Sequence, residues 1–177
     1  MGRIFKSGKR AEEYGCVNNS AKTTPTDMEN IEIRTATLED RALVVHLDHR
    51  LDPTEHTELN REKKLTKALR EGHCFIILAN QRAVGFFIFD YRFFDQGWIE
   101  LMVIDEEFRG KGIAGQVFDL IGKRCQADKV FTSTNRSNRR MQRALVKAGF
   151  SFAGELCGLD DGDPEWFYYR KADRTGG

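Results

Sequence analysis

Apolar residues recur along this chain with two different periods, and the periods separate strands from helices. Two segments, 74–78 and 83–91, are almost unbroken apolar runs, which predicts central strands covered on both faces. In other segments apolar residues recur at i, i+3, i+4 and i+7, which predicts helices with one buried face. The expected elements are a strand at 31–34, helices at 37–50 and 58–70, strands at 74–78, 83–91 and 98–104, a helix that begins near Gly112, a strand at 130–134, a helix that follows 135–137 and ends at Gly149, and strands at 150–155 and 166–170.

Cap and turn residues support these boundaries. Thr37 precedes the first helix and Asp40 follows three residues later, which is the spacing of a capping box. Asp52-Pro53 breaks that helix, and Gly72 ends the next one. The order predicts a mixed α/β fold of the α+β-like type, with a central mixed sheet of six to seven strands and helices on both faces. The chain contains no internal repeat.

The first 27 residues differ in composition from the rest of the chain. They are polar and aperiodic, which predicts a disordered extension before a single domain at 28–173 and a flexible tail at 174–177. Met28 stands directly before the first strand, so it is a possible natural start, and a leader derived from a vector stays open. The basic N-terminus is not followed by an apolar segment, so we expect no secretory signal.

Composition and charge exclude several classes of protein. The chain has 177 residues and a formal net charge of +1, so neither a nucleic-acid partner nor an anionic membrane is expected. The four cysteines, Cys16, Cys74, Cys125 and Cys157, show no metal-ligand spacing, and we expect reduced, mostly buried thiols in a cytoplasmic protein without a metal site. His46 and His49 lie three residues apart on one helix, but no third ligand is in frame.

The most informative segment is 98–120, WIELMVIDEEFRGKGIAGQVFDL, in which a buried strand leads through a charged loop into a helix. Free N–H groups at a helix start bind phosphate, and Gly110 and Gly112 let a pyrophosphate approach the backbone closely. A tight turn with solvated cations would explain the same residues. A dinucleotide fold is a weaker alternative, because the next strand ends in Thr, Ser and Asn rather than in an acidic residue.

This segment resembles the signature of the GCN5-related N-acetyltransferase (GNAT) superfamily, [RQ]-x-x-G-x-[GA] after a strand and before a helix. The matching residues are Arg109, Gly112 and Ala114. A second segment, NRRMQRALVKAGF at 138–150, is similar to the family pattern N-x-x-(A/M)-x-x-x-x-x-K-x-G-F, and LDDGDPEWFYY at 159–169 is similar to the closing hairpin of many bacterial members. The resemblance covers about 31–171.

The resemblance implies an acetyl-CoA site and names its residues. Family members splay a pair of central strands and bind the pantetheine arm between them, which implicates the backbone of Met102, Val103 and Ile104. The pyrophosphate would bind at the start of the helix, and Asn138 matches a family residue that contacts acetyl-CoA. A simple helix cap is the alternative role for Asn138. The residues implied at the helix start are Arg109, Gly110, Lys111, Gly112, Ile113, Ala114 and Gly115.

Catalysis requires a deprotonated amine, and a proton assists the leaving thiolate. Glu100 is the only charged residue at 98–104, and some family members place a base on this strand, so Glu100 is the expected base or water-holder. A structural ion pair is the alternative. Leu145 stands where many members carry a Tyr acid. Tyr168, Tyr169 or a water would then supply the proton, although strand packing also explains both tyrosines.

The sequence therefore predicts an acetyl-CoA-dependent N-acetyltransferase. The acceptor is an amine on a small molecule, peptide or protein, and a homodimer is compatible with the sequence. A non-catalytic acyl-CoA-binding module is the first alternative, supported by Leu145, and a nucleotide-binding domain is the second.

Overall fold

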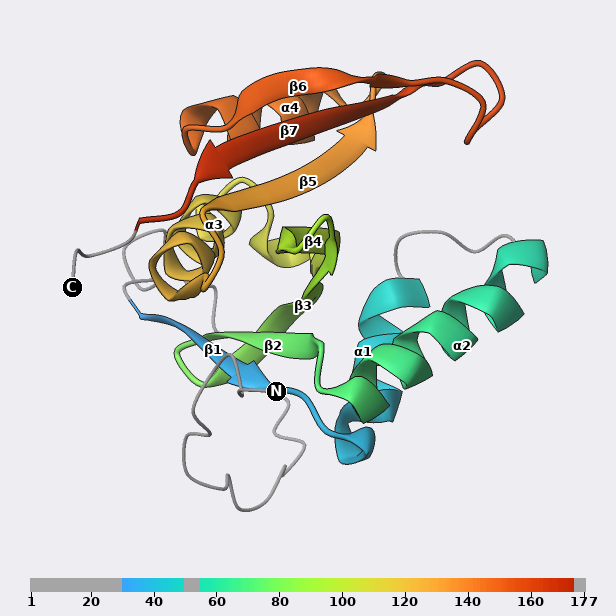
Figure 1. Ribbon diagram of the computed structural model, residues 1–177. Coiled ribbons are helices and arrows are strands. Elements are labelled where there is room, and N and C mark those ends of the chain that lie inside the picture. The colour runs from blue at the N-terminus through green and yellow to red at the C-terminus, as the bar shows by residue number, and fades with distance from the viewer. Residues whose placement is uncertain (1–29, 50–54, 174–177) are drawn as a thin grey trace.

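The computed structural model describes residues 30–49 and 55–173 (Figure 1). It contains seven strands and four α-helices with two short 3-10 helices, η2 and η3. The elements are β1 Ile31–Thr35, η2 Leu38–Asp40, α1 Arg41–His49, α2 Glu55–Glu71, β2 Cys74–Ala79, β3 Arg82–Phe93, β4 Gln96–Ile104, η3 Glu106–Phe108, α3 Ile113–Arg124, β5 Lys129–Asn135, α4 Arg139–Lys147, β6 Ser151–Leu156 and β7 Glu165–Lys171.

All seven strands form one sheet in the order β1-β2-β3-β4-β5-β7-β6. Among the described strands, β4 and β5 form the one parallel pair, and every other neighbouring pair is antiparallel. The expected mixed sheet of six to seven strands is therefore confirmed. A doubly wound nucleotide-binding sheet is built from parallel strands, so this topology does not fit it.

Local sequence explains how the strands and helices begin and end. Both halves of the capping box at Thr37 and Asp40 are formed, as the sequence predicted. The tight turn after β2 places Asn80 and Gln81 at φ 48° and 64°, the left-handed conformation that a two-residue hairpin turn requires. Gly72 ends α2 with φ 72°.

The sheet separates two hydrophobic cores. The side chains of Phe75, Phe87 and Val117 belong to the core under α3 and α4, and those of Ile76, Phe86 and Val44 belong to the core under α1 and α2. Figure 1 shows the two helix layers on opposite sides of the sheet. Strands β2 and β3 are buried on both faces, as their apolar runs predicted.

Some expectations need correction. Phe150 precedes β6 rather than belonging to it, and β4 begins two residues earlier than predicted. Cys157 is exposed, while Cys74 and Cys125 are buried, and burial raises the pKa of the Cys74 thiol to about 12. Predictions for residues 1–27, 174–177, Cys16 and Asp52-Pro53 lie outside the described residues. No helix in the described part of the chain is long and apolar enough to span a membrane.

Candidate active site

Strands β4 and β5 pair over a short distance and then diverge. Their register covers Gly97 to Ile99 on β4 and ends at the pair Ile99–Thr132. Beyond Ile99, β4 continues to Ile104 and remains paired with β3 alone. The backbone edge of β4 at 100–104 is therefore released from β5, and this edge includes the predicted pantetheine-binding residues Met102, Val103 and Ile104.

The glycine-rich segment forms an open helix start at the end of β4. Gly110 and Gly112 have φ of 80° and 81°, which side chains rarely adopt, and Gly112 is the N-cap of α3. A Cβ atom added at Gly112 or Gly115 would meet no atom within 4 Å. The N–H groups of the first helical turn have no preceding helical carbonyl to bond. An anionic group fits this space, because the N–H groups and the positive end of the helix dipole both favour it.

The cations around this helix start have different roles. The Nε of Arg109 donates a 2.9 Å hydrogen bond to the carbonyl oxygen of Ile104, so Arg109 holds the loop against the strand. The Lys111 ammonium lies 5.1 Å from the ring centroid of Phe108. The guanidinium of Arg140 from α4 lies 3.5 Å from the position that a Cβ would take at Gly110. Arg140 therefore stands beside the loop, although no sequence motif had indicated it.

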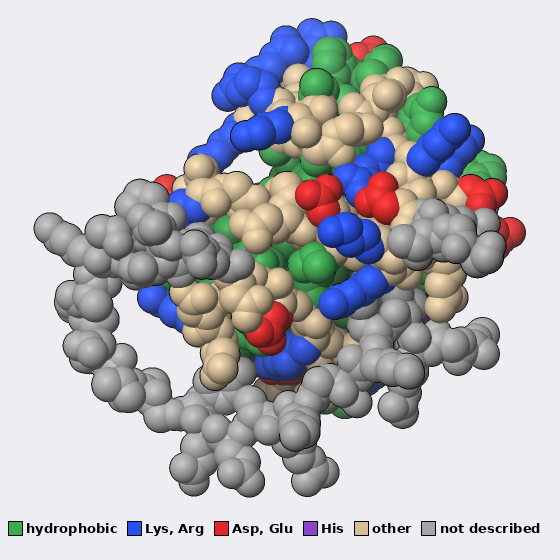
Figure 2. Space-filling view, turned by 90° about the vertical axis from the view of Figure 1, so that its left-hand side faces the viewer, with side chains coloured by type: hydrophobic (Ala, Val, Ile, Leu, Met, Phe, Trp, Pro, Cys, Tyr) green, Lys and Arg blue, Asp and Glu red, His purple; other side chains and the backbone are tan. Residues whose placement is uncertain are grey.

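Helix α4 adds positive charge to the same side of the molecule. Figure 2 shows Lys and Arg side chains gathered at the top of one face, the height at which α4 and β6 lie in Figure 1. The exposed cations of α4 are Arg139, Arg140, Arg143 and Lys147. A basic surface beside an open helix start raises the local concentration of anions.

Asn138 and Leu145 both belong to the α4 segment. The Oδ1 of Asn138 accepts a 3.1 Å hydrogen bond from the N–H of Met141, so the residue is the N-cap of α4. Leu145 is completely buried in the core under α3 and α4. The position at which many family members carry a tyrosine is here within the hydrophobic core.

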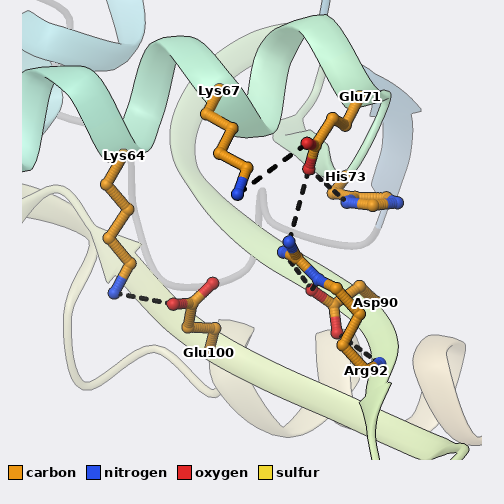
Figure 3. Close-up of polar contacts among 7 residues, drawn as sticks. All are labelled: Lys64, Lys67, Glu71, His73, Asp90, Arg92 and Glu100. Carbon is orange, nitrogen blue, oxygen red and sulfur yellow. Dashed lines mark hydrogen bonds and ion pairs between the residues drawn. The ribbon is translucent and has the colours of Figure 1, made fainter.

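Glu100 lies at an irregularity of β4. Ile88 pairs with Leu101 and Phe89 pairs with Ile99, so Glu100 is the extra residue of a β-bulge. Its Oε1 lies 2.9 Å from Nζ of Lys64 on α2 (Figure 3). The Glu100 side chain is 29% exposed. The bulge therefore aims a partly accessible carboxylate toward α2 from the segment of β4 that has left β5.

A second ion-pair network lies beside Glu100 and connects α2 with β3. The side chain of Asp90 is 3% exposed, and its Oδ2 accepts a 2.6 Å hydrogen bond from Nε of Arg92. Arg92 also reaches Glu71 at the end of α2, at 3.4 Å (Figure 3). The hydrogen bond to Asp90 raises the pKa of Arg92 above its usual value. These contacts connect the end of α2 to the sheet.

Tyr168 lies on the other face of the sheet. It is 3% exposed and belongs to the core under α3 and α4, whereas Glu100 contacts α2. Burial raises the pKa of the Tyr168 phenol, and the positive charge of Arg139 partly opposes this. The phenol therefore holds its proton near neutral pH. The structure does not bring the two predicted catalytic residues onto one face.

Aromatic rings cover the sheet on the face that carries Glu100. Trp98 stacks on Phe93 with ring centroids 4.7 Å apart and on Phe167 at 5.9 Å. Phe131, the register partner of Trp98, stacks on Tyr169 at 5.7 Å. Trp98 precedes Glu100 by two residues on β4, so the aromatic surface and Glu100 share this strand. Sequence reasoning missed this surface, because the rings come from four different strands.

The histidines do not form a metal site in the described part of the chain. His46 is exposed on α1, and the side chain of His49 lies outside the described residues. No group of three or more His, Cys, Asp or Glu side chains among the described residues is placed to hold a metal ion.

Comparison with known proteins identifies relatives of this chain. A model of the GNAT acetyltransferase family matches residues 36–150, well over half of the chain. A search among curated proteins found no significant match. A GNAT acetyltransferase from Bacillus cereus is similar in structure, with a TM-score of 0.73 and 28% identity over 82% of this chain and 99% of that one.

Two further solved structures share the fold. The ribosomal-protein-S18-alanine N-acetyltransferase from Escherichia coli has a TM-score of 0.63 and 16% identity, over 83% of this chain and 97% of that one. A chimeric spermidine N-acetyltransferase from Vibrio cholerae has a TM-score of 0.66 and 15% identity, over 80% and 95%. The family match, together with the diverging strands and the glycine-rich helix start, shows that this chain belongs to the GNAT acetyltransferase family, whose general reaction is acetyl transfer to an amine.

Proposed function

We propose that this protein is an acetyl-CoA-dependent N-acetyltransferase that acts on a primary amine. The observation that carries the proposal is the divergence of β4 from β5 after Ile99, beside an open helix start at Gly112. The free edge of β4 offers backbone hydrogen-bonding groups to an extended arm, and the helix start offers N–H groups to an anion. Together they fit a long ligand with an amide-rich arm and a pyrophosphate.

In this proposal each predicted binding residue has a physical role. The freed edge of β4 at Met102, Val103 and Ile104 bonds the pantetheine amides, although the Ile104 carbonyl already accepts from Arg109. The helix start at 110–115 binds the pyrophosphate through N–H groups. Arg140 and Lys111 add positive charge beside it. Asn138 acts first as the N-cap of α4, and its contact with the donor is an additional role.

Acetyl-CoA supplies an acetyl thioester to the site. The acceptor must lose a proton before its nitrogen can attack, and Glu100 is the carboxylate that accepts this proton, directly or through a water. The bulge at Glu100 and its partial exposure support this role. A proton for the leaving thiolate comes from a water or from Tyr168, whose buried phenol keeps its proton near neutral pH.

The experiment that tests the proposal measures thiol release from acetyl-CoA with a panel of amines. The family relatives indicate which acceptor classes belong in that panel, a polyamine such as spermidine and a peptide with an N-terminal alanine. We expect amine-dependent thiol release and binding of CoA, but not of NAD, by calorimetry. An absence of CoA binding would contradict the proposal. We propose the cytoplasm as the compartment of this protein. A homodimer is also compatible with the proposal, and size-exclusion chromatography tests it.

A non-catalytic acyl-CoA-binding module is the second function to test. The observation that favours it is Leu145, which is fully buried where many family members carry a tyrosine as the acid. This alternative predicts tight CoA binding without thiol release for any amine in the panel. The two measurements together therefore distinguish an enzyme from a binding module.

A further inference from the structure

Lys64 differs from Lys67 in the ion-pair partner of its ammonium, because Lys67 pairs with Glu71 on the same helix whereas Lys64 pairs with a residue of the sheet. Lys63 and Lys67 line a groove at the α1–α2 layer, together with Arg41 and Arg70. Lys64 is not among the residues that line it. Its Nζ reaches the sheet and lies 2.9 Å from Oε1 of Glu100 (Figure 3).

We propose that Lys64 is an internal acceptor, which this protein acetylates on its own chain. The primary amine of Lys64 occupies, on Glu100, the place that the amine of an external acceptor would take. The inference rests on the proposed function, since it requires Glu100 to accept the proton of the reacting amine. The geometry already provides the second requirement, a primary amine in contact with that carboxylate.

The other cations near Glu100 pair with other carboxylates, so Lys64 is its ion-pair partner. Arg92 is held by Asp90 and Glu71, and Lys67 lies 4.0 Å from Glu71 one turn further along α2 (Figure 3). The positive charge of Arg92 is close enough to interact with Glu100, but its short contacts are with the other two carboxylates. Among the ion pairs of the described residues, Glu100 is paired with Lys64.

The ion pair is also weak enough to release the amine. The Lys64 side chain is 45% exposed and that of Glu100 is 29% exposed. Pairs between exposed charges stabilise a protein little, because water screens them and two flexible side chains must be held together. The four-carbon stem of lysine leaves the amine free to turn from Glu100 toward the freed edge of β4.

The chemical step balances without another reactant. The Lys64 ammonium gives one proton to Glu100, and the neutral nitrogen then forms a C–N bond with the acetyl carbonyl carbon as the C–S bond breaks. The nitrogen loses a second proton and the thiolate takes one up. The products are acetyl-lysine, CoA thiol and one released proton. Because acetyl-lysine is neutral, the modification also removes the ion-pair partner of Glu100.

Peptide mapping by mass spectrometry tests the inference on the full chain. Purified protein is incubated with acetyl-CoA and no other amine, and the acetylated fraction of each lysine is followed with time. We expect acetyl-Lys64 to form faster than acetyl-Lys67 by about tenfold or more, since only Lys64 has assistance from Glu100. Lys67 is the matched control, because it lies on the same helix and is more exposed, at 63% against 45%.

Three variants separate an internal reaction from spontaneous acetylation. Glu100→Gln and Gly112→Asp should each reduce the rate at Lys64 to that of Lys67, whereas Lys67→Arg should leave it unchanged. The initial rate per molecule should not depend on protein concentration. Equal rates at Lys64 and Lys67 in the wild type, or a rate at Lys64 that rises with protein concentration, would overturn the inference. If thiol release with external amines persists in that case, the proposed function stands and only the internal acceptor is refuted.

A measurement without acetyl-CoA tests the position of the amine separately. Spermidine serves as the probe, and its affinity is measured by calorimetry. Lys64→Gln removes the ammonium from Glu100, so we expect spermidine to bind severalfold more tightly than to the wild type. Lys67→Gln removes the same charge one turn away and should have a smaller effect. Equal effects of the two substitutions would show that Lys64 does not occupy the acceptor position.

Discussion

The hydroxyl of Thr132 on β5 donates a 3.0 Å hydrogen bond to the carbonyl oxygen of Ile99 on β4, at the last residue pair before the two strands diverge. Both residues are buried. The bond lies at the point where the gap opens, and beyond it one backbone edge of β4 faces that gap while the other edge stays paired with β3. The position of this hydrogen bond therefore marks where the backbone edge of β4 becomes free of β5.

Thr132→Val should weaken this junction without changing the shape of the side chain. The Ile99 carbonyl loses its donor inside the protein, so we expect the free energy of unfolding to fall by about 1–2 kcal/mol. Thermal denaturation measures the effect, and calorimetry with acetyl-CoA should show weaker binding. Thr134→Val is the control. Thr134 is buried two residues further along β5, and the structure records no side-chain hydrogen bond for it, so its replacement should not reduce stability.

Gly112→Asp should abolish acetyl-CoA binding while the fold survives. Aspartate adds a side chain and a negative charge where we propose that the pyrophosphate binds. The left-handed backbone conformation adds strain of about 1–2 kcal/mol for any residue with a Cβ. Gly149→Asp is the matched control, because Gly149 also has φ 81° and open space around its Cβ position, and it follows the far end of α4. Equal calorimetric affinities for the two variants would contradict the assignment.

Glu100→Gln keeps the size of the side chain and removes the carboxylate that we propose as the proton acceptor. Turnover should fall by about 100-fold or more if general-base assistance is lost, while acetyl-CoA affinity persists. Steady-state kinetics with the best amine of the panel measures the effect. Glu107→Gln removes an exposed carboxylate that pairs with Arg82 near the glycine loop and should leave turnover unchanged. Wild-type turnover of Glu100→Gln across the pH range would exclude the role.

Most of the fold was predictable because its signals are local. The capping box at Thr37 needs only residues within one turn, and the apolar runs of β2 and β3 require cover on both faces wherever they are placed. The glycine loop was also predictable from the sequence, because glycine adopts the positive φ that Gly110 and Gly112 have without any help from distant residues. These features depend on neighbours in sequence and not on tertiary packing.

The candidate site was only partly predictable because its key contacts are distant in sequence. Lys64 precedes Glu100 by 36 positions, and nothing in the α2 sequence distinguishes it from Lys63 or Lys67. The bulge that directs Glu100 toward α2 depends on the register between β3 and β4, which the apolar pattern leaves undetermined. The cysteines were expected to be mostly buried, and the apolar pattern could not single out Cys157, which follows the edge strand β6 and is exposed.

Asp40 should make the stability of this protein depend on pH. Burial raises the pKa of its carboxyl, but hydrogen bonds from Arg34 and from the Thr37 backbone outweigh that effect, so the folded-state pKa lies below its ordinary value of 3.8. The stabilisation is therefore present above pH 3.8 and is lost as the pH falls through the lower, folded-state value.

Asp40→Asn should lower the free energy of unfolding by about 1–2 kcal/mol at pH 7, through the lost cap and ion pair. The difference from the wild type should narrow in acid, where the wild-type carboxyl is protonated too. Urea denaturation at pH 7 and at the lowest pH that keeps both proteins folded measures this. If the difference in the free energy of unfolding between the two proteins stays constant with pH, the effect comes from the shape of the Asp40 side chain and not from its charge. Glu39→Asn is the control, because Glu39 is exposed on the same 3-10 helix.

The acidic loop between β6 and β7 provides a test of acceptor charge. Four carboxylates lie within six positions: Asp160, Asp161 and Asp163 in the loop, and Glu165 at the start of β7. Two of them also hold the loop in place. Asp160 accepts a 2.6 Å hydrogen bond from the Asn135 side chain, and Asp163 accepts from the N–H and the hydroxyl of Ser137. Both partners are neutral, so the loop keeps its negative charge after these bonds form.

If the acceptor is a cation, this charge should recruit it, and the effect should disappear with salt. Replacing both Asp160 and Asp163 with Asn should raise the KM for spermidine at low ionic strength, leave acetyl-CoA affinity unchanged, and flatten the rise of KM with salt. The reason is that exposed charges are screened beyond about 10 Å at 0.1 M salt.

Asp161→Asn is the control that distinguishes loss of charge from loss of loop structure, because Asp161 is exposed and makes neither of the two loop contacts. Steering predicts that this single change also raises KM at low salt, by a smaller factor. A KM increase that is confined to the double variant and persists at high salt would instead show that the two aspartates act by holding the loop in position.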